Sequence, residues 1–515
     1  MKKLLIFIFS LLSVPMSAQI HADVEMQASV SNDRTPLWLN ANKYGLSSLN
    51  ANNGYVRATL TRDLEQPKSK HWDWGFGADV ALPVGYVSES ACGRYTTNYI
   101  VQQLYADVRY RRFVLTIGAK QQPMQLHDNR LSSGAQTLGR NARPVPQVRL
   151  GLDDWWTVPG VNGWLQAMAH ASFGVMTDGA WEEKFANGGQ YIYNKLTRYH
   201  EKAGYLRIGK QSRFPLTFVF GLEMAAQFGG DLYNWKGTDQ SDYASDYHMR
   251  LKSDLKSYWN AFMPGGGDTG ETSFQNSEGN QLGSWIFRFD WTRPDYAIGL
   301  YADHFFEDHS SMFLLDYDGY GEGENWQQKE EWRYFLYKLN DLQLGLDLKL
   351  NKGRWLKRAL VEFINTKYQS GPIYHDRNSG NSDHLGGIDD YYNHSTLPGW
   401  QHWGQVIGNP LYRSPLYNCA DGYISSTDNR FTAWHFGAEG CLGFDALTYR
   451  VLYTWQKGFG TYRSPFVRPE VSNSYLAELS YRLADFTFVV GVASDFGKIY
   501  GDNTGAQFTL KYHIR

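Results

Sequence analysis

The sequence predicts an all-β fold, a transmembrane antiparallel β-barrel of the outer-membrane type. Three observations predict it. The chain begins with the pattern of a secretory leader, short segments of alternating apolar and polar residues recur over its whole length, and the connections between these segments are alternately short and long. The leader predicts export from the cytoplasm, and the other two observations predict the architecture.

Residues 1–18 have the three parts of a signal peptide. Two lysines open the segment, an apolar run covers residues 4–14, and small residues precede the expected cleavage after Ala18. The apolar run is too short to span a bilayer as a helix, which takes about 20 residues. The rest of the sequence has no apolar run of that length, so we expect one β-barrel domain over residues 19–515.

The composition excludes some classes of function. The net charge of −2 gives no electrostatic case for binding nucleic acid. The mean hydropathy of −0.49 is that of a water-soluble protein, but lipid-facing and lumen-facing residues cancel within each strand of a membrane barrel. Three cysteines, Cys92, Cys419 and Cys441, are too few for a disulfide scaffold, and whether Cys419 and Cys441 pair stays open.

The strand pattern is clearest at residues 341–350, where five leucines alternate with Asp, Gln, Gly, Asp and Lys. Successive side chains of a strand point to opposite faces, so this segment has one apolar and one polar face. A strand of about ten residues crosses a bilayer when tilted. We expect 18 strands, an even number that returns the chain to the side where it began: 24–31, 55–63, 72–81, 98–109, 112–120, 145–152, 164–175, 203–210, 215–225, 284–293, 295–305, 341–350, 357–368, 432–443, 446–456, 474–483, 486–495 and 504–513.

The two faces of these strands have different partners. The apolar set would contact lipid, and the polar set would line a lumen. Tyrosine and tryptophan near strand ends, such as Trp72, Trp74, Trp285, Tyr453 and Trp455, suit the aromatic girdles of a membrane barrel. A secreted sandwich or propeller would leave one face of each strand without an explanation. The expected lumen-lining charges are Arg57, Asp107, Arg288, Asp347, Lys349 and Lys511.

Connection lengths are an independent indication of a barrel. Short turns are expected near 110–112, 211–214, 294, 351–356, 444–445 and 484–485, and long connections near 121–144, 176–202, 226–283, 306–340, 369–431 and 457–473. Outer-membrane barrels have short periplasmic turns and long extracellular loops. The long connections are therefore expected at the cell surface.

The long connection 369–431 holds the candidate binding residues. Aromatic rings stack on the apolar faces of sugars, and Asp and His side chains bond their hydroxyl groups. On this basis a carbohydrate site is expected at Asp389, Asp390, Tyr391, Tyr392, Trp400, His402 and Trp403. In the alternative interpretation these aromatic side chains pack the long loop against itself and close the barrel mouth.

No motif indicates catalysis, a metal or a cofactor. His375, His384, His394 and His402 do not have the spacing of a metal site, and the glycines at 265–267 lack the lysine and flanking elements of a phosphate-binding loop. A Gly-x-Ser-x-Gly or His-Glu-x-x-His motif is also absent. We therefore expect no enzyme, although an outer-membrane hydrolase stays an alternative.

Six blocks of sequence resemble those of the Wzi-type capsule assembly family, in particular its Bacteroides-like branch. They lie in the same order over most of the chain: Thr35–Gly45, Gly139–Pro146, Ala226–Gly230, Gly279–Trp285, His304–Asp308 and Ile407–Leu411. The resemblance implies an outer-membrane barrel that acts as a lectin, with helical material on the periplasmic side and loops that occlude the lumen. The C-terminal His513-Ile514-Arg515 departs from the terminal aromatic residue common in such barrels.

The expected function is therefore binding of capsular polysaccharide during capsule assembly or attachment at the outer membrane. The expected partners are that polysaccharide and outer-membrane lipid, without nucleic acid, and the oligomeric state stays open. A porin or substrate-selective channel is the main alternative, because the inward charges would suit a polar lumen.

Overall fold

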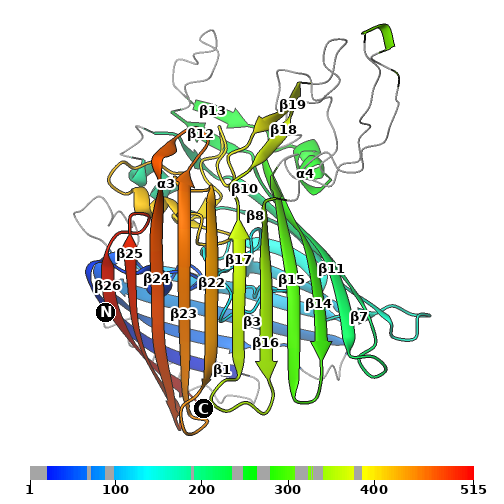
Figure 1. The fold of residues 1–515 in the computed structure, drawn as a ribbon, viewed down its shortest axis with the longest axis vertical. Helices are drawn as coiled ribbons and strands as arrows, with labels where there is room; N and C mark the ends of the chain where they lie inside the picture. The colour runs from blue at the N-terminus through cyan, green and yellow to red at the C-terminus, as the bar shows by residue number, and fades with distance from the viewer. Residues whose placement is uncertain are drawn as a thin grey trace.

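The computed structural model describes residues 20–65, 71–86, 98–186, 191–234, 248–263, 279–307, 323–325, 328, 340–375 and 385–514. The predicted signal peptide lies outside these residues. Eighteen antiparallel strands of the described chain form one closed barrel (Figure 1). Closure comes from β1 (Ile20–Arg34) and β26 (Asn503–Ile514), which pair from Ala22↔Ile514 to Ser31↔Gly505.

Each of the 18 predicted segments overlaps one strand of the barrel, so the predicted strand number is confirmed. Every strand pairs with its neighbour along the chain. The strands between β1 and β26 are β2 (Asn50–Arg62), β3 (Trp72–Val84), β4 (Ile100–Tyr110), β5 (Phe113–Ala119), β6 (Gln147–Leu152), β8 (Leu165–Val175), β10 (Arg198–Ile208), β11 (Leu216–Phe228), β14 (Asn280–Thr292), β15 (Tyr296–Glu307), β16 (Leu342–Leu350), β17 (Arg358–Asn365), β22 (Phe431–Cys441), β23 (Leu447–Gly460), β24 (Pro465–Leu483) and β25 (Phe486–Gly497).

Short turns gather at one end of the barrel and long connections at the other, as predicted (Figure 1). One predicted long connection, 457–473, is wrong. β23 continues to Gly460 and β24 begins at Pro465, so only residues 461–464 connect them. Gly458, Gly460 and Pro465 look like a loop in the sequence, but proline is tolerated as the first residue of a strand and glycine at a bulge, and the pairing shifts register between Gly458 and Gly460.

The outer surface carries the apolar half of the alternation. Leu344 and Leu346 of β16 are 42% and 46% exposed, whereas Gln343 between the outward positions is fully buried inside. Trp72 and Trp74, two predicted girdle residues, are also exposed. Large apolar side chains are exposed on strand after strand around the barrel, far more than a water-soluble surface carries. Such a belt needs a lipid environment.

The inward charges form ion pairs. Arg288 bonds Asp347 at 2.8 Å, Lys120 bonds Asp107 at 2.5 Å, and Arg57 bonds Asp79. Pairing offsets the cost of moving charges out of bulk water. The lumen is therefore polar but nearly neutral where these strands line it.

The remaining elements belong to the connections, all at the long-loop end except β7, which lies between the end of β6 and the start of β8 at the short-turn end. All helices of the described residues lie at the long-loop end, not on the periplasmic side that the family resemblance implies, and none is long and apolar enough to cross a membrane. These elements are α2 (Leu37–Asn40), α3 (Gly179–Phe185), α4 (Leu255–Phe262), η2 (Gly323–Asn325), η3 (Pro415–Asn418), β7 (Trp156–Thr157), β9 (Tyr193–Lys195), β12 (Gly230–Tyr233), β13 (His248–Leu251), β18 (Ser370–His375), β19 (Leu385–Ile388), β20 (Gln401–His402) and β21 (Gln405–Val406).

Three connections fold back into the barrel and form its core. We call residues 35–49, 120–146 and 389–430 the plug. The largest buried cluster joins plug residues such as Trp400 to inward residues of the wall. Burial of aromatic and leucine side chains stabilises this core by roughly 1.5–3 kcal/mol per side chain.

Buried hydrogen bonds fix the plug to the wall. Glu362 of β17 accepts bonds from the Ser132 hydroxyl at 2.6 Å and the Ser133 amide at 2.8 Å. Farther along the wall, the Trp38 indole donates to Thr454 of β23, and the Leu37 amide donates to Asp495 of β25. Hydrogen bonds to a charged acceptor are worth about 1.5–3 kcal/mol each. The plug is thus bonded to three strands, β17, β23 and β25, which lie within one run of five neighbouring strands.

The cysteines do not form the pair that the sequence left open. Cys419 is disulfide-bonded, whereas Cys441 is a buried free thiol. Cys441 ends β22 at the short-turn end, and Cys419 follows η3 in the plug. The third cysteine, Cys92, lies outside the described residues.

Candidate functional site

Four of the seven predicted carbohydrate-binding residues lie in the core of the plug. Tyr391, Tyr392, Trp400 and His402 are at most 1% exposed. Tyr392 stacks on Tyr412 with ring centroids 3.9 Å apart. In this arrangement the four side chains pack the loop, as the alternative interpretation held, and offer no surface to a ligand.

His402 fastens the plug to the connection after β8. Its Nδ1 lies 2.9 Å from the Arg143 carbonyl oxygen, and its Nε2 lies 3.2 Å from the Thr177 amide nitrogen. A carbonyl only accepts and an amide only donates, so the ring is neutral, with its proton on Nδ1. Burial lowers the pKa of His402, and the Arg143 charge acts in the same direction.

The other three predicted residues are partly exposed. Asp390 accepts a hydrogen bond from Asn393 at 3.0 Å, and burial raises the pKa of its carboxyl. Asp389 precedes it, and the Arg143 guanidinium lies 4.6 Å from the centre of the Trp403 ring. The Trp400 amide donates a hydrogen bond to the Tyr392 carbonyl, so the predicted residues at 389–392 lie next to those at 400–403. A carbohydrate-binding role for the seven residues stays a prediction.

A second candidate surface, missed in the sequence, is the small sheet of β9, β12 and β13 at the long-loop end (Figure 1). Tyr233 lies opposite Tyr193 on one side and opposite His248 on the other. In the next row, Asp231 lies opposite Lys195 and Arg250. Because side chains alternate along a strand, these two rows share one face. We call Tyr193, Tyr233, His248, Lys195, Asp231 and Arg250 the ring-and-charge face.

The opposite side of this sheet is its packing side. Leu232 lies between Asp231 and Tyr233 in sequence and is fully buried, and Asn194 opposite to it is also buried. The ring-and-charge face is covered in part as well: Tyr193 is buried and Tyr233 packs against the main core, whereas His248 and Arg250 are exposed. The signal in the sequence is the alternation of Tyr191, Tyr193 and Lys195, but these strands are too short for a period of two to stand out.

The rings of this face stack in a row. Tyr193 and Tyr233 have centroids 4.8 Å apart and planes inclined by 7°, and His248 follows at 4.7 Å. The Lys195 ammonium lies 5.1 Å from the centre of the Tyr233 ring and bonds Glu183 of α3 at 2.9 Å. Exposed Tyr191 and Tyr423, with ring centroids 6.0 Å apart, form a second aromatic pair.

Two groups at the face, Tyr193 and its neighbour Glu183, have fixed protonation states at neutral pH. Burial and the Glu183 carboxylate raise the pKa of Tyr193 to about 12, so the phenol keeps its proton. The hydrogen bond from Lys195 lowers the pKa of Glu183, which therefore stays ionised. The surface thus combines neutral rings with cationic and anionic groups, and such a combination suits a sugar polymer.

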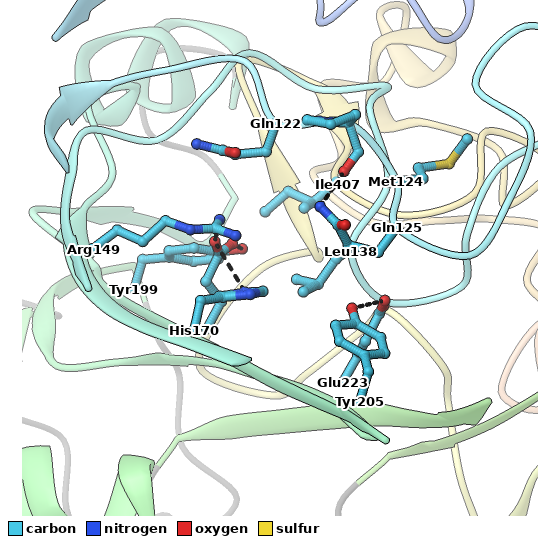
Figure 2. Close-up of a pocket in the computed structure, with 13 residues that line it drawn as sticks. Gln122, Met124, Gln125, Leu138, Arg149, His170, Tyr199, Tyr205, Glu223 and Ile407 are labelled. Carbon is cyan, nitrogen blue, oxygen red and sulfur yellow. Dashed lines mark hydrogen bonds and ion pairs between the residues drawn. The ribbon is translucent and has the colours of Figure 1, made fainter. Parts of the chain in front are cut away.

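Figure 2 shows a cavity between the plug and the wall. Arg149, His170 and Tyr199 point toward one another there, and Tyr205 bonds Glu223 at 2.6 Å. The Arg149 guanidinium donates to Glu201 at 2.7 Å. The cavity measures about 50 Å³, and a neighbour that shares five of its residues measures about 60 Å³. Each has room for a few water molecules.

The described residues contain no group of three or more His, Cys, Asp and Glu side chains that could hold a metal ion. Burial lowers the pKa of His394 to about 4, so this ring is neutral, and it accepts a hydrogen bond from the Thr396 amide. His384, the side chain of His375 and the glycines at 265–267 lie outside the described part of the structure.

No protein-family model matches the chain, and no curated protein matches it. Among solved structures, the chain is similar to Wzi of Escherichia coli, with a TM-score of 0.54 and 12% identity over 95% of this chain and 84% of Wzi. Wzi is described as an outer-membrane protein involved in group 1 capsule assembly and as a carbohydrate-binding β-barrel. At this identity the similarity shows the fold, which is that of outer-membrane barrels.

Two further solved structures match at lower scores. OccAB4 of Acinetobacter baumannii has a TM-score of 0.44 and 9% identity over 97% of this chain and all of that chain. OprD of Pseudomonas aeruginosa has a TM-score of 0.43 and 10% identity over 96% and 94%.

Proposed function

We propose that this protein is an outer-membrane barrel of the Wzi type that binds capsular polysaccharide at its long-loop end and helps to hold it at the cell surface. The observation that carries the proposal is the ring-and-charge face above a lumen filled by the plug. Its rings and charges are those that recognise sugars, and the apolar belt of the barrel suits a membrane.

Binding is favoured over transport by the packing of the plug. Glu362 of β17 and Asp495 of β25 hold the plug to the wall. The cavities beside it have room for water only. A channel would need a continuous path through this core, so the substrate-selective channel remains the second candidate and an outer-membrane hydrolase the third.

A repeating polymer suits a partly exposed face of this kind. Each sugar would gain a weak ring contact and a hydrogen bond, and successive repeats would engage several molecules or several rings at once. Linked weak contacts raise the overall affinity by 10²–10⁴-fold without any single tight site. Lys195 and Arg250 could in addition pair with acidic sugars, since both are cations on this face.

The test measures capsule retention. Deletion of the gene should leave capsule synthesised but shed into the medium, and the double substitution Tyr233→Ala and His248→Ala should reproduce the shedding. Tyr368→Ala is the matched control, because Tyr368 is a 49% exposed ring outside the ring-and-charge face. Unchanged cell-bound capsule after gene deletion would contradict the proposed function.

A direct binding assay locates the site. The purified protein is titrated with the surface polysaccharides of its host, and Trp403→Ala is compared with the Tyr233 and His248 double substitution. Loss of binding only in Trp403→Ala would move the site to the predicted loop, while loss only in the double substitution would place it on the small sheet.

A further inference from the structure

The side of the plug that faces the short-turn end carries a cluster of cations. Five of them, Lys43, Arg130, Arg140, Arg358 and Arg450, face four carboxylates, Asp128, Glu439, Glu478 and Glu25. Of these, Glu25 accepts a hydrogen bond from Tyr55 at 2.7 Å and lies 3.6 Å from Arg57 of the wall. Three cations come from the plug and two from β17 and β23 of the wall. The cluster therefore carries more cations than carboxylates.

Every carboxylate of the cluster is already paired. Arg358 bonds Asp128 at 2.6 Å and also Glu439. Arg130 bonds Glu439 at 2.7 Å, and Arg450 bonds Glu478 at 2.8 Å. These contacts account for Arg130, Arg358 and Arg450.

Lys43 and Arg140 are the surplus cations. Within the described chain, the Lys43 ammonium donates to the neutral Gln507 amide, and the Arg140 guanidinium lies over the Tyr44 ring at 5.6 Å. Neither is bonded to a carboxylate there. The Tyr44 amide donates to the Arg140 carbonyl at 2.8 Å, so the two segments that carry these cations are in direct contact.

Unused donors remain at the same place. The Nε atoms of Arg140 and Arg450 are buried and have no hydrogen-bond partner among the described residues. Burial lowers the pKa of Lys43 to about 8; the Glu478 and Glu25 carboxylates oppose this shift, and repulsion from Arg450 and Arg140 adds to it. A buried donor and a buried charge are both costly when unpaired. An anionic ligand would supply the hydrogen-bond acceptors and the negative charge that the protein side chains do not.

We propose that Lys43, Arg140 and the Nε of Arg450 form a binding site for a phosphate group, open to the short-turn end of the lumen. A phosphate monoester carries a charge of about −1.5 to −2 at neutral pH, which matches the two surplus cations. Its oxygens accept the paired N–H groups of an arginine. Arg130 is 48% exposed at this cluster, and its partner Glu439 lies near the short-turn end of β22, so solvent reaches the site from that side.

The test is calorimetric titration of the full-length protein in detergent with inorganic phosphate. Arg140→Gln and, separately, Lys43→Gln are each expected to weaken phosphate binding at least tenfold. Arg213→Gln, an exposed arginine in the turn before β11, is the matched control and should bind as the parent protein does. A circular-dichroism spectrum and resistance to protease that equal those of the parent show that each variant is folded with its plug in place.

Two outcomes would overturn the site: no phosphate binding by the parent protein, or binding that both substitutions leave unchanged. A parallel titration with glucose 1-phosphate separates two sources of the group. At least tenfold tighter binding of glucose 1-phosphate assigns the site to a phosphorylated sugar, and equal affinity assigns it to free phosphate. The site does not depend on polysaccharide binding at the opposite end.

Discussion

His402 bonds the Thr177 amide in the connection after β8, and the Trp400 ring stacks on Tyr199 of β10. His402 and Trp400 have the right chemistry for a sugar site, yet the structure uses them to pack and fasten the plug. Both roles require aromatic area and hydrogen-bonding groups, so the sequence pattern is the same for both. What separates the roles is exposure, which depends on distant partners such as Thr177 and Tyr199.

At the residue scale, His402 predicts a pH effect. Its pKa is lowered in the folded protein, whereas an unfolded chain titrates near 6.5. Below that pH the unfolded state binds more protons, so the stability that the neutral ring contributes is lost as the pH falls, by at most about 1.4 kcal/mol per pH unit. Guanidinium unfolding in detergent at pH 7.5 and 5.5 should show this loss, and His402→Gln should reduce it. Equal pH dependence in both proteins would contradict the assignment.

The sequence predicts an element well where the alternation of apolar and polar residues is complete within that one strand. β16 was found from its sequence alone because its leucines face outward and Gln343 and Asp347 face inward, as alternation requires. β9, β12 and β13 were missed because three or four residues are too few to establish a period. Residues 465–473 of β24 fall in a predicted connection, and this part of the strand contains Pro465 and Pro469, a residue type that strands seldom contain.

At the element scale, the orientation of β16 predicts a position-dependent cost. Leu346 lies in the middle of the strand and is 46% exposed toward lipid, whereas Leu350 ends the strand at the short turn. Leu346→Arg should destabilise the barrel by about 2–4 kcal/mol, and Leu350→Arg by about 0–1 kcal/mol, because the cost of a cation falls toward the interface. Unfolding in lipid vesicles measures both. Similar costs at the two positions would mean that the strand does not cross a bilayer as proposed.

The whole molecule divides into a part that the sequence predicts and a part that it does not. The wall could be predicted because inside and outside alternate residue by residue within each strand. The plug could not, because its contacts join distant positions: Ser132 to Glu362, Tyr392 to Gln136, and Lys43 to Gln507. The family resemblance implied an occluded lumen, but only the coordinates identify which segments fill it.

At the scale of the whole molecule, the filled lumen predicts that the protein does not conduct ions. In planar bilayers the parent protein should give no stable single-channel currents, since the plug packs in the lumen and is bonded to the wall by Glu362 and Asp495. Replacement of residues 124–137 by a glycine–serine linker of equal length removes the Glu362 contacts and should produce measurable conductance. Tyr233→Ala, which leaves the Glu362 and Asp495 contacts in place, should give no currents. Large, stable currents from the parent protein would favour the channel alternative, because they require a water-filled path that a packed plug does not leave.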